Sequence, residues 1–293
     1  MAPPPKPWPT GICEQSEPMV RRVLAGNGSP YTYTGTQTYL VGLSDLAVID
    51  PGPDDPAHID ALMAAIAGTP VLAICCTHTH RDHSPAARAL AALTGAPIIG
   101  CAPLTIDKDE AHDEPRADAP FDPDYAPDRV LADGESVCGT GWTLTAVATP
   151  GHTSNHLCFS LEESGALFSG DHVMGWSTTV VAPPDGDMGD YLASLERLYE
   201  RDDRIYYPAH GPAVEQPRRL VRGMIGHRRQ RERQIMRLVS QGTGNVEAMI
   251  PLMYKGVDPR LWGAAAQSTR AHLQDMERRG LVTRFEGVWT IQT

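Results

Sequence analysis

Three histidines and one aspartate occur within six consecutive residues of this chain, in the segment His78-Thr79-His80-Arg81-Asp82-His83. The segment directly follows the apolar run 71–76, whose composition is typical of a buried strand. Because side chains alternate along a strand, the first two histidines are expected on one side, and the following turn can direct Asp82 and His83 from a second direction. So many polar groups beside a buried strand are unfavourable unless something satisfies them. The segment therefore predicts a metal site.

Three later segments place a histidine or an aspartate in a glycine-bearing turn after an apolar run. They contain His152, Asp171 and His210. Taken singly, each could be a turn histidine or a helix cap, but their recurrence indicates a site assembled from loops on a rigid scaffold. Asp50, before Pro51-Gly52, is either a turn-forming residue or one that orients a ligand histidine.

The remaining histidines receive no role from the sequence. His172 is expected to point away from the metal or to lie outside its ligands. The others lie in no cluster along the chain, and they are His58, His112, His156, His227 and His272.

Short apolar runs alternate with helical patterns over the first two thirds of the chain. Many adjacent strands lack a crossover helix between them, which favours a mixed sheet arrangement with helices outside. Strands are expected at 31–41, 46–50, 71–76, 97–100, 143–149, 157–161, 166–169 and 204–207, and helices at 57–67, 85–93 and 190–199.

The pattern H-x-H-x-D-H with downstream Gly-His, Gly-Asp and Ala-His-Gly resembles the metallo-β-lactamase superfamily over residues 18–214. The resemblance implies an α+β fold, an αββα sandwich with the site at one edge of its sheets. It also implies two metal ions joined by a carboxylate. Carried over by position, His78, His80 and His152 would hold one metal, Asp82, His83 and His210 the second, and Asp171 would bridge both.

Nitrogen-rich ligation with carboxylates suits two Zn²⁺ ions best, with Fe or Mn as alternatives. Two metals about 3.5–4 Å apart can share a water, lower its pKa toward ~7 and present a bridging hydroxide to a carbonyl or phosphorus centre. We also expect a catalytic role for Asp82, as a proton shuttle from the attacking water to the leaving group.

Some relatives within the superfamily fit the residues less well. The flavodiiron members place a glutamate where this chain has His80, so hydrolysis is preferred to electron transfer. Antibiotic-destroying lactamases generally lack the bridging aspartate that Asp171 supplies. The segment from Asp171 to His210 is too short for the large inserted domain of the RNA-cleaving and DNA-repair branch, and the C-terminal region does not resemble that of glyoxalase II.

Charge is distributed unevenly along the 293 residues, whose formal net charge is −11. Residues 1–216 contain 11 Lys and Arg against 30 Asp and Glu, whereas residues 217–293 contain 14 against 6. This predicts a catalytic domain over 1–216 and a second domain over 217–293. Helical patterns at 246–254 and 261–276, followed by a hairpin, indicate a winged helix in the second domain.

A sandwich followed by a winged helix resembles the lactamase-beta-like subfamily, which includes a mitochondrial endoribonuclease acting on single-stranded RNA. Eight arginines between 218 and 237 could contact phosphates, or they could form a solvated face or pair with carboxylates of the first domain. The acidic, proline-containing segment 105–128 is either a solvated loop or a lid over the site.

The expected function is a dinuclear metal-dependent hydrolase acting on RNA or another phosphodiester, or on an ester or lactone. β-Lactam hydrolysis is the alternative within the enzyme class, and a metal-stabilised nucleic-acid-binding or regulatory protein is the alternative outside it. The expected partners are a small-molecule or single-stranded RNA substrate and a second copy of the chain. The six cysteines lack C-x-x-C pairs and are expected in the core in reduced form. No apolar run predicts a membrane span or signal segment, so a cytoplasmic location is expected.

Overall fold

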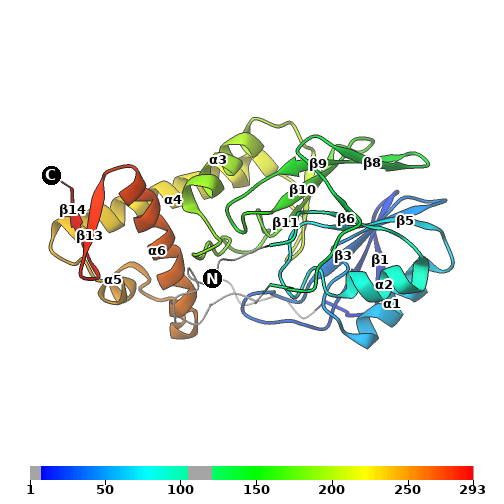
Figure 1. The fold of residues 1–293 in the computed structure, drawn as a ribbon, viewed down its shortest axis with the longest axis horizontal. Helices are drawn as coiled ribbons and strands as arrows, with labels where there is room; N and C mark the ends of the chain where they lie inside the picture. The colour runs from blue at the N-terminus through cyan, green and yellow to red at the C-terminus, as the bar shows by residue number, and fades with distance from the viewer. Residues whose placement is uncertain (1–7, 105–120, 293) are drawn as a thin grey trace.

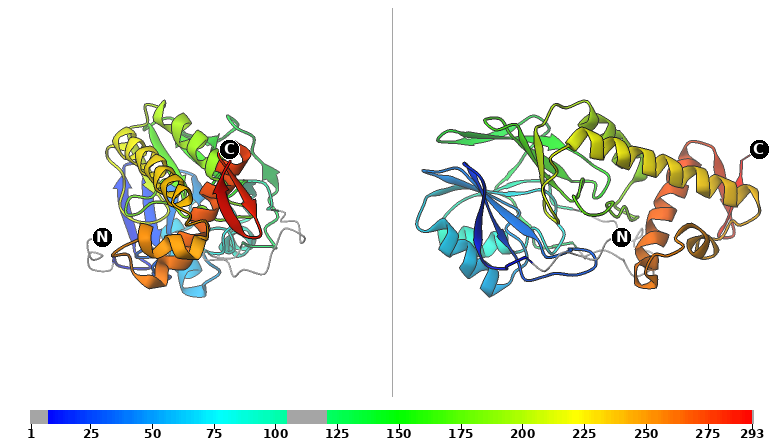
Figure 2. Two further views of the ribbon diagram at one scale, coloured as in Figure 1. Left: turned by 90° about the vertical axis from the view of Figure 1, so that its left-hand side faces the viewer. Right: turned by 180° about the vertical axis from the view of Figure 1, so that it is seen from behind.

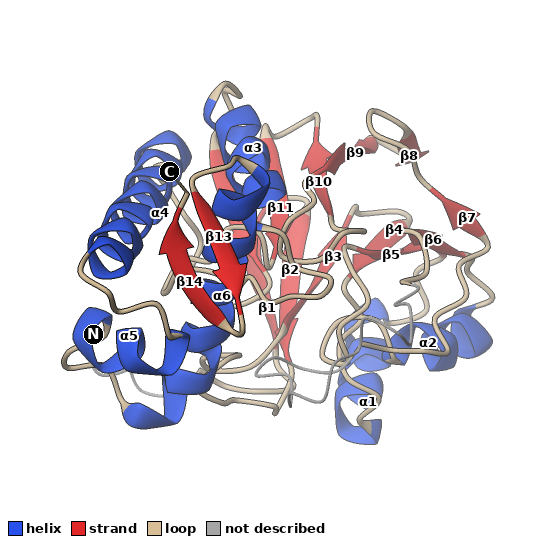
Figure 3. Cartoon of the chain, turned by 60° about the vertical axis from the view of Figure 1, so that its left-hand side comes forward, coloured by secondary structure: helices blue, strands red, loops and turns tan. Residues whose placement is uncertain are grey.

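Two β-sheets stack face to face with helices outside, in the αββα order that the sequence predicts (Figures 1 and 3). This computed structural model describes residues 8–104 and 121–292. Most of the acidic segment 105–128, together with His112, therefore lies outside the described residues.

The first sheet contains seven strands that neighbour one another in chain order. Strands β1 to β4 pair antiparallel, and β4 to β7 pair parallel with helices α1 and α2 in the crossovers. The strands are β1 (Cys13–Glu17), β2 (Val20–Leu24), β3 (Gln37–Val41), β4 (Leu46–Ile49), β5 (Val71–Cys76), β6 (Ile98–Gly100) and β7 (Arg129–Val130), and the helices are α1 (Pro56–Ile66) and α2 (Ala86–Thr94).

The second sheet contains five strands in the order β12-β11-β10-β9-β8. Its strands β8 to β11 form an antiparallel meander, and helix α3 crosses back so that β12 pairs parallel with β11. These elements are β8 (Ser136–Gly139), β9 (Trp142–Ala148), β10 (Leu157–Leu161), β11 (Ala166–Gly170), α3 (Met188–Tyr199) and β12 (Ile205–Pro208).

The main hydrophobic core lies on both faces of the first sheet, against the second sheet on one face and against helices α1 and α2 on the other. Leu40 and Ile74 from the first sheet and Trp142 and Phe159 from the second are almost completely buried in it. The indole of Trp142 also donates a 2.7 Å hydrogen bond to the carboxylate of Asp45, which satisfies its one polar atom. Packing of this density holds the strand ends, and so the loops that follow them, in fixed positions.

The C-terminal region consists of helices followed by a hairpin, as predicted. The elements are α4 (Pro217–Ser240), α5 (Val246–Met253), the short 3-10 helix η1 (Pro259–Leu261), α6 (Trp262–Arg278), β13 (Val282–Phe285) and β14 (Val288–Ile291). Helices α5 and α6 and the hairpin enclose a separate small core that includes Met249, Leu273 and Trp289.

Helix α4 runs from the sandwich into the C-terminal unit (Figure 2) and contributes to two cores, one that it forms with α3 against the second sheet and the C-terminal one. Its first half packs Val221 and Met224 against α3, and its second half places Ile235 and Val239 in the C-terminal core. Proline at its first position is compatible with a helix start, since that residue needs no amide donor. The boundary between 216 and 217 stays a prediction; α4 begins at Pro217, so its first half packs on the sandwich although it lies beyond that boundary.

The expectation of a strand over 31–41 is wrong for its first half. Residues 31–34 form a turn, and β3 begins only at Gln37. Tyr33 and Gly35 have φ values of 59° and 135°, which are incompatible with a regular strand. The sequence reading also omitted strands β1, β2, β7 and β8, which are short or largely exposed and carry little apolar alternation.

All six cysteines are free, but they are not all in the core. Cys13 and Cys138 are exposed, and the other four are buried. Cys13 lies on the terminal strand β1 and Cys138 on β8, the terminal strand of the second sheet, where side chains alternate toward solvent.

The part of the chain that the structure describes contains no helix both long and apolar enough to cross a membrane.

Candidate metal centre

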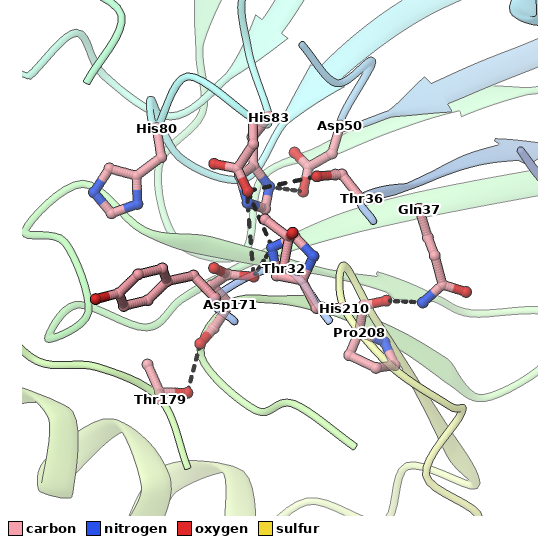
Figure 4. A network of polar contacts seen from close by, with 12 residues as sticks. Thr32, Thr36, Gln37, Asp50, His80, His83, Asp171, Thr179, Pro208 and His210 are labelled. Atoms are coloured by element: carbon pink, nitrogen blue, oxygen red, sulfur yellow. Dashed lines mark hydrogen bonds and ion pairs between the residues drawn. The ribbon is translucent and has the colours of Figure 1, made fainter. Parts of the chain in front are cut away.

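The predicted ligands meet at one edge of the two sheets, because each follows the end of a strand. His78 and His80 come after β5, His152 after β9, Asp171 after β11 and His210 after β12. Segments far apart along the chain thereby bring their side chains into one buried cluster, part of which Figure 4 shows.

The first ligand group contains His78, His80 and His152. Nδ1 of His80 lies 3.0 Å from Nε2 of His78 and 3.1 Å from Nε2 of His152. All three rings are buried. Three ring nitrogens therefore converge on one point, as a tetrahedral or larger metal coordination shell requires.

In two of these rings, the hydrogen bond made by Nδ1, on the side away from the cluster, fixes the tautomer. His152 donates from Nδ1 to the carbonyl of Val180 at 2.7 Å. Nδ1 of His78 lies 3.0 Å from the Thr77 hydroxyl, whose own hydrogen goes to Asp50 at 2.8 Å. Each Nε2 therefore directs a lone pair inward, and lone pairs cannot satisfy one another. A cation at this point would satisfy them, which is the usual reason for such outer hydrogen bonds around a metal site.

The second ligand group contains Asp82, His83 and His210. Nε2 of His210 lies 3.1 Å from Oδ2 of Asp82, and Nε2 of His83 lies 3.5 Å from the same oxygen. His83 donates from Nδ1 to Asp50 at 3.0 Å, and His210 from Nδ1 to the carbonyl of Gly35 at 3.2 Å. The near nitrogens of both rings are therefore available to a metal.

Asp171 lies between the two groups and faces each with a different oxygen. Its Oδ1 is 3.3 Å from Nε2 of His210 and 3.6 Å from Nε2 of His83, whereas its Oδ2 is 3.7 Å from Nε2 of His152. Oδ1 of Asp171 and Nε2 of His83 are buried without a hydrogen-bond partner among the described residues. Such atoms are costly to bury, so the donor set fits two metal ions joined by this carboxylate.

The electrostatics of the protein side chains also indicate that positive charge belongs here. Burial alone would lower the pKa of His210, but the carboxylates of Asp171 and Asp82 outweigh it and raise that pKa to about 10. Asp82, Asp171 and Asp50 likewise outweigh burial and hold the pKa of His83 well above its usual value. In the first group, burial and the neighbouring His152 lower the pKa of His80 to about 3. His78 and His80 are thus neutral, and protons or metal must balance the carboxylates of the second group.

Asp50 orients the cluster instead of only forming a turn. Its carboxylate accepts from His83, from the Thr77 hydroxyl and from the Thr77 amide at 2.8 Å. It is 1% exposed and belongs to none of the candidate ligand groups. This is the second of the two alternatives that the sequence left open for it.

Several contributors to the site carry no recognisable signal in the sequence. His156, to which the sequence assigns no role, is buried beside His78. Its Nε2 accepts a hydrogen bond from the Asp171 amide at 3.2 Å, and its Nδ1 lies 2.8 Å from the Thr149 hydroxyl. Gly35 and Val180 contribute backbone carbonyls, which cannot be recognised from the residue type. His172 is buried next to Tyr191 and belongs to none of the ligand groups, in the position that the sequence suggested.

Comparisons with known proteins agree with the fold. Residues 32–210 match the Metallo-beta-lactamase superfamily, and residues 246–289 match the Beta-lactamase associated winged helix domain. The chain therefore belongs to the metallo-β-lactamase superfamily. The relatives of this chain in that superfamily are hydrolases, the superfamily binds divalent metals through clusters of histidine and aspartate, and this chain is accordingly a hydrolase of that class.

Particular relatives resemble three quarters or more of the chain. "Beta-lactamase-like protein 2 homolog" from Drosophila melanogaster is 32% identical over 89% of this chain and 88% of its own length. "Atrochrysone carboxyl ACP thioesterase" from Aspergillus fumigatus is 33% identical over 75% of this chain and 64% of its own length. A beta-lactamase domain protein from Burkholderia ambifaria has the same fold, with a TM-score of 0.77 at 20% identity over 96% of this chain and 94% of its own.

Replacing Asp82 by alanine is expected to remove one metal and lower turnover by about a hundredfold, since this residue is expected both to ligate and to transfer a proton. Its side chain is 14% exposed, compared with 1% or less for His83 and His210, so it is the member of its group that reaches the accessible side. Metal content by mass spectrometry and steady-state kinetics are the measurements. Asp124→Ala, which removes an exposed carboxylate nearby, is the control, and wild-type turnover with two metals in Asp82→Ala would refute both roles.

Proposed function

We propose that this chain is a dinuclear zinc hydrolase whose substrates are esters, with thioesters and lactones included. The observation that carries this proposal is the arrangement of Asp171, whose two oxygens face two separate groups of histidine and aspartate ligands. When bound, a pair of metal ions supplies an activated water and stabilises the oxygen that gains charge. Zinc is preferred because imidazole and carboxylate ligands suit it, with iron and manganese as the alternatives.

The chain's own residues would hold and orient that chemistry. Outer hydrogen bonds that the histidine rings donate to Asp50 and to the carbonyls of Gly35 and Val180 fix the rings, and Asp82, whose side chain is 14% exposed, would accept and return a proton. Support for an ester or thioester comes from the relative named as a thioesterase, which is 33% identical to this chain. A cytoplasmic location and a homodimer stay predictions.

Single-stranded RNA is the second candidate substrate. Arg222, Arg233 and Arg237 on α4 are exposed, and none of them has an ionic partner among the described residues. Others on the same helix are already paired within the chain, as Arg218 is with Asp202 at 3.2 Å and Arg229 with Glu196 at 2.7 Å. The helix thus keeps part of its positive charge available for phosphates.

A panel of substrates tests the proposal. We expect the purified chain to bind two metals and to hydrolyse an aryl ester and an aryl thioester, and we expect a chelator to abolish turnover and added zinc to restore it. The other substrates in the panel are a lactone, a single-stranded oligoribonucleotide and a chromogenic β-lactam. Preferred cleavage of the oligoribonucleotide would favour the second candidate, and tight metal binding without turnover of any substrate would refute a hydrolytic role.

A further inference from the structure

A cavity of about 290 Å³ opens between the sandwich and the C-terminal unit, next to the metal centre. Its apolar walls come from the loop after β2, the loop after β11, the end of α5 and α6. They include Tyr31, Met174, Trp176, Tyr254, Leu261 and Ala264. Trp176, on the sandwich side of the cavity, is held in place by Tyr33, which stacks on it with ring centroids 4.9 Å apart.

The cavity shares one wall with the metal centre. That wall is formed by Thr179 and Val180, which line the cavity on one side. On the other side, the carbonyl of Val180 accepts from His152. The Thr179 hydroxyl donates to the carbonyl of Asp171 at 2.7 Å, as Figure 4 shows. A molecule in the cavity is therefore separated from the metal ligands by a single layer of residues.

Two arginines of α4 line this mainly apolar cavity without a counter-charge. Arg228 is 3% exposed, donates to the carbonyl of Thr179 and lies 5.1 Å over the ring of Tyr191. Arg231 donates to the carbonyl of Met253 at 2.8 Å and lies 4.2 Å over the ring of Tyr254. Within residues 8–104 and 121–292, no carboxylate pairs with either guanidinium, although Arg218 and Arg229 on the same helix each have one. A buried cation that lacks an anion is costly, which indicates that the anion comes from outside.

Unpaired donors line the same cavity. Nε of Arg228, Nε of Arg231 and Nε1 of Trp176 are buried N–H groups without a hydrogen-bond acceptor among the described residues. Each of these atoms can only donate. A ligand that completes the cavity must therefore offer acceptors near the arginines and apolar surface elsewhere.

We propose that this cavity binds an amphipathic organic anion, namely an acyl or aryl group that carries a carboxylate or a phosphate. Its place beside Thr179 and Val180 makes it the binding site for the part of the substrate away from the bond that is cleaved. This role as a substrate site rests on the proposed function, whereas binding of the anion does not. The apolar lining favours such a molecule over a polynucleotide, which would need a continuous charged groove.

Isothermal titration calorimetry of the whole chain with octanoate, octyl phosphate and octanol tests the proposal. We expect at least one of the two anions to bind about tenfold or more tightly than octanol, because a hydrogen bond between charged groups contributes enough binding free energy for that difference. Comparison of octanoate with octyl phosphate shows which head group the arginines prefer. Equal binding of all three molecules, or binding of a single-stranded oligonucleotide alone, would overturn the assignment.

Two variants locate the binding. Arg231→Gln removes the charge but keeps a side chain that can bond to Met253, and it should reduce anion binding to the level of octanol. Ala264→Phe fills the cavity and should abolish binding of all three molecules. Arg229→Gln, on the exposed side of the same helix, is the matched control and should bind like the unaltered chain. Unchanged anion binding in both Arg231→Gln and Ala264→Phe would overturn the proposal.

The two proposals fail separately because binding is measured without turnover. A chain that binds octanoate in an Arg231-dependent way but hydrolyses nothing refutes the proposed function and leaves the cavity assignment standing. A chain that hydrolyses aryl esters with the same KM and kcat after Ala264→Phe supports the proposed function and refutes the cavity as a substrate site.

Discussion

Asp171→Ala is expected to reduce hydrolysis by about a thousandfold or more, because losing the several kcal/mol that a pair of metals contributes corresponds to such a factor. The reason is geometric. Each of its two oxygens lies near a different ligand group, 3.3 Å from Nε2 of His210 and 3.7 Å from Nε2 of His152. Both groups lose a ligand at once, whereas Asp82→Ala affects only the second. We therefore expect metal content to fall further in Asp171→Ala than in Asp82→Ala.

Metal analysis and steady-state kinetics on the same preparations test this difference. Asp133→Asn is a suitable control, since it alters a carboxylate that pairs with Arg197 on the surface at 2.8 Å. It should keep both metals and full turnover. If Asp171→Ala retains two metals and loses no activity, the carboxylate does not join the two groups.

Trp142→Ala is expected to destabilise the sandwich by about 3–5 kcal/mol, the range found for removing a large aromatic side chain from a core. Trp142 is 1% exposed and is among the largest fully buried side chains in the core between the sheets. For a domain of this size the loss corresponds to a decrease in Tm on the order of 10 °C. Thermal unfolding followed by circular dichroism measures it, with metal content held constant because bound metal also shifts Tm.

Trp142→Phe separates packing from hydrogen bonding. This variant keeps a large ring but loses the bond from the indole to Asp45. We expect it to lower Tm less than Trp142→Ala does, since most of the buried area is retained. An equal decrease for the two variants would show that the bond to Asp45, and not the buried ring, dominates at this position.

The candidate ligands could be predicted from the sequence because ligand chemistry depends on residue type and spacing. Three histidines and an aspartate within six residues after a buried strand have few structural explanations. The winged helix was also predictable, since helical periodicity and a Glu286-Gly287 turn are local signals, and Glu286 and Gly287 do adopt positive φ there. Strand β1 was missed because it is exposed and polar, and β2 because Arg21 and Arg22 interrupt its apolar residues, so neither has the apolar alternation on which such predictions depend.

The sequence by itself determined which side chains could hold metal and that residues 1–216 and 217–293 carry opposite net charge. Only the tertiary structure decided how they are used. It gave Asp50 an orienting role, placed His156 against the cluster and supplied the carbonyls of Gly35 and Val180 as acceptors. It also brought Arg228 and Arg231 beside a cavity that neither unit forms alone. The physical reason is that residue type fixes which bonds a group can make, whereas packing of distant segments fixes which partner lies within reach.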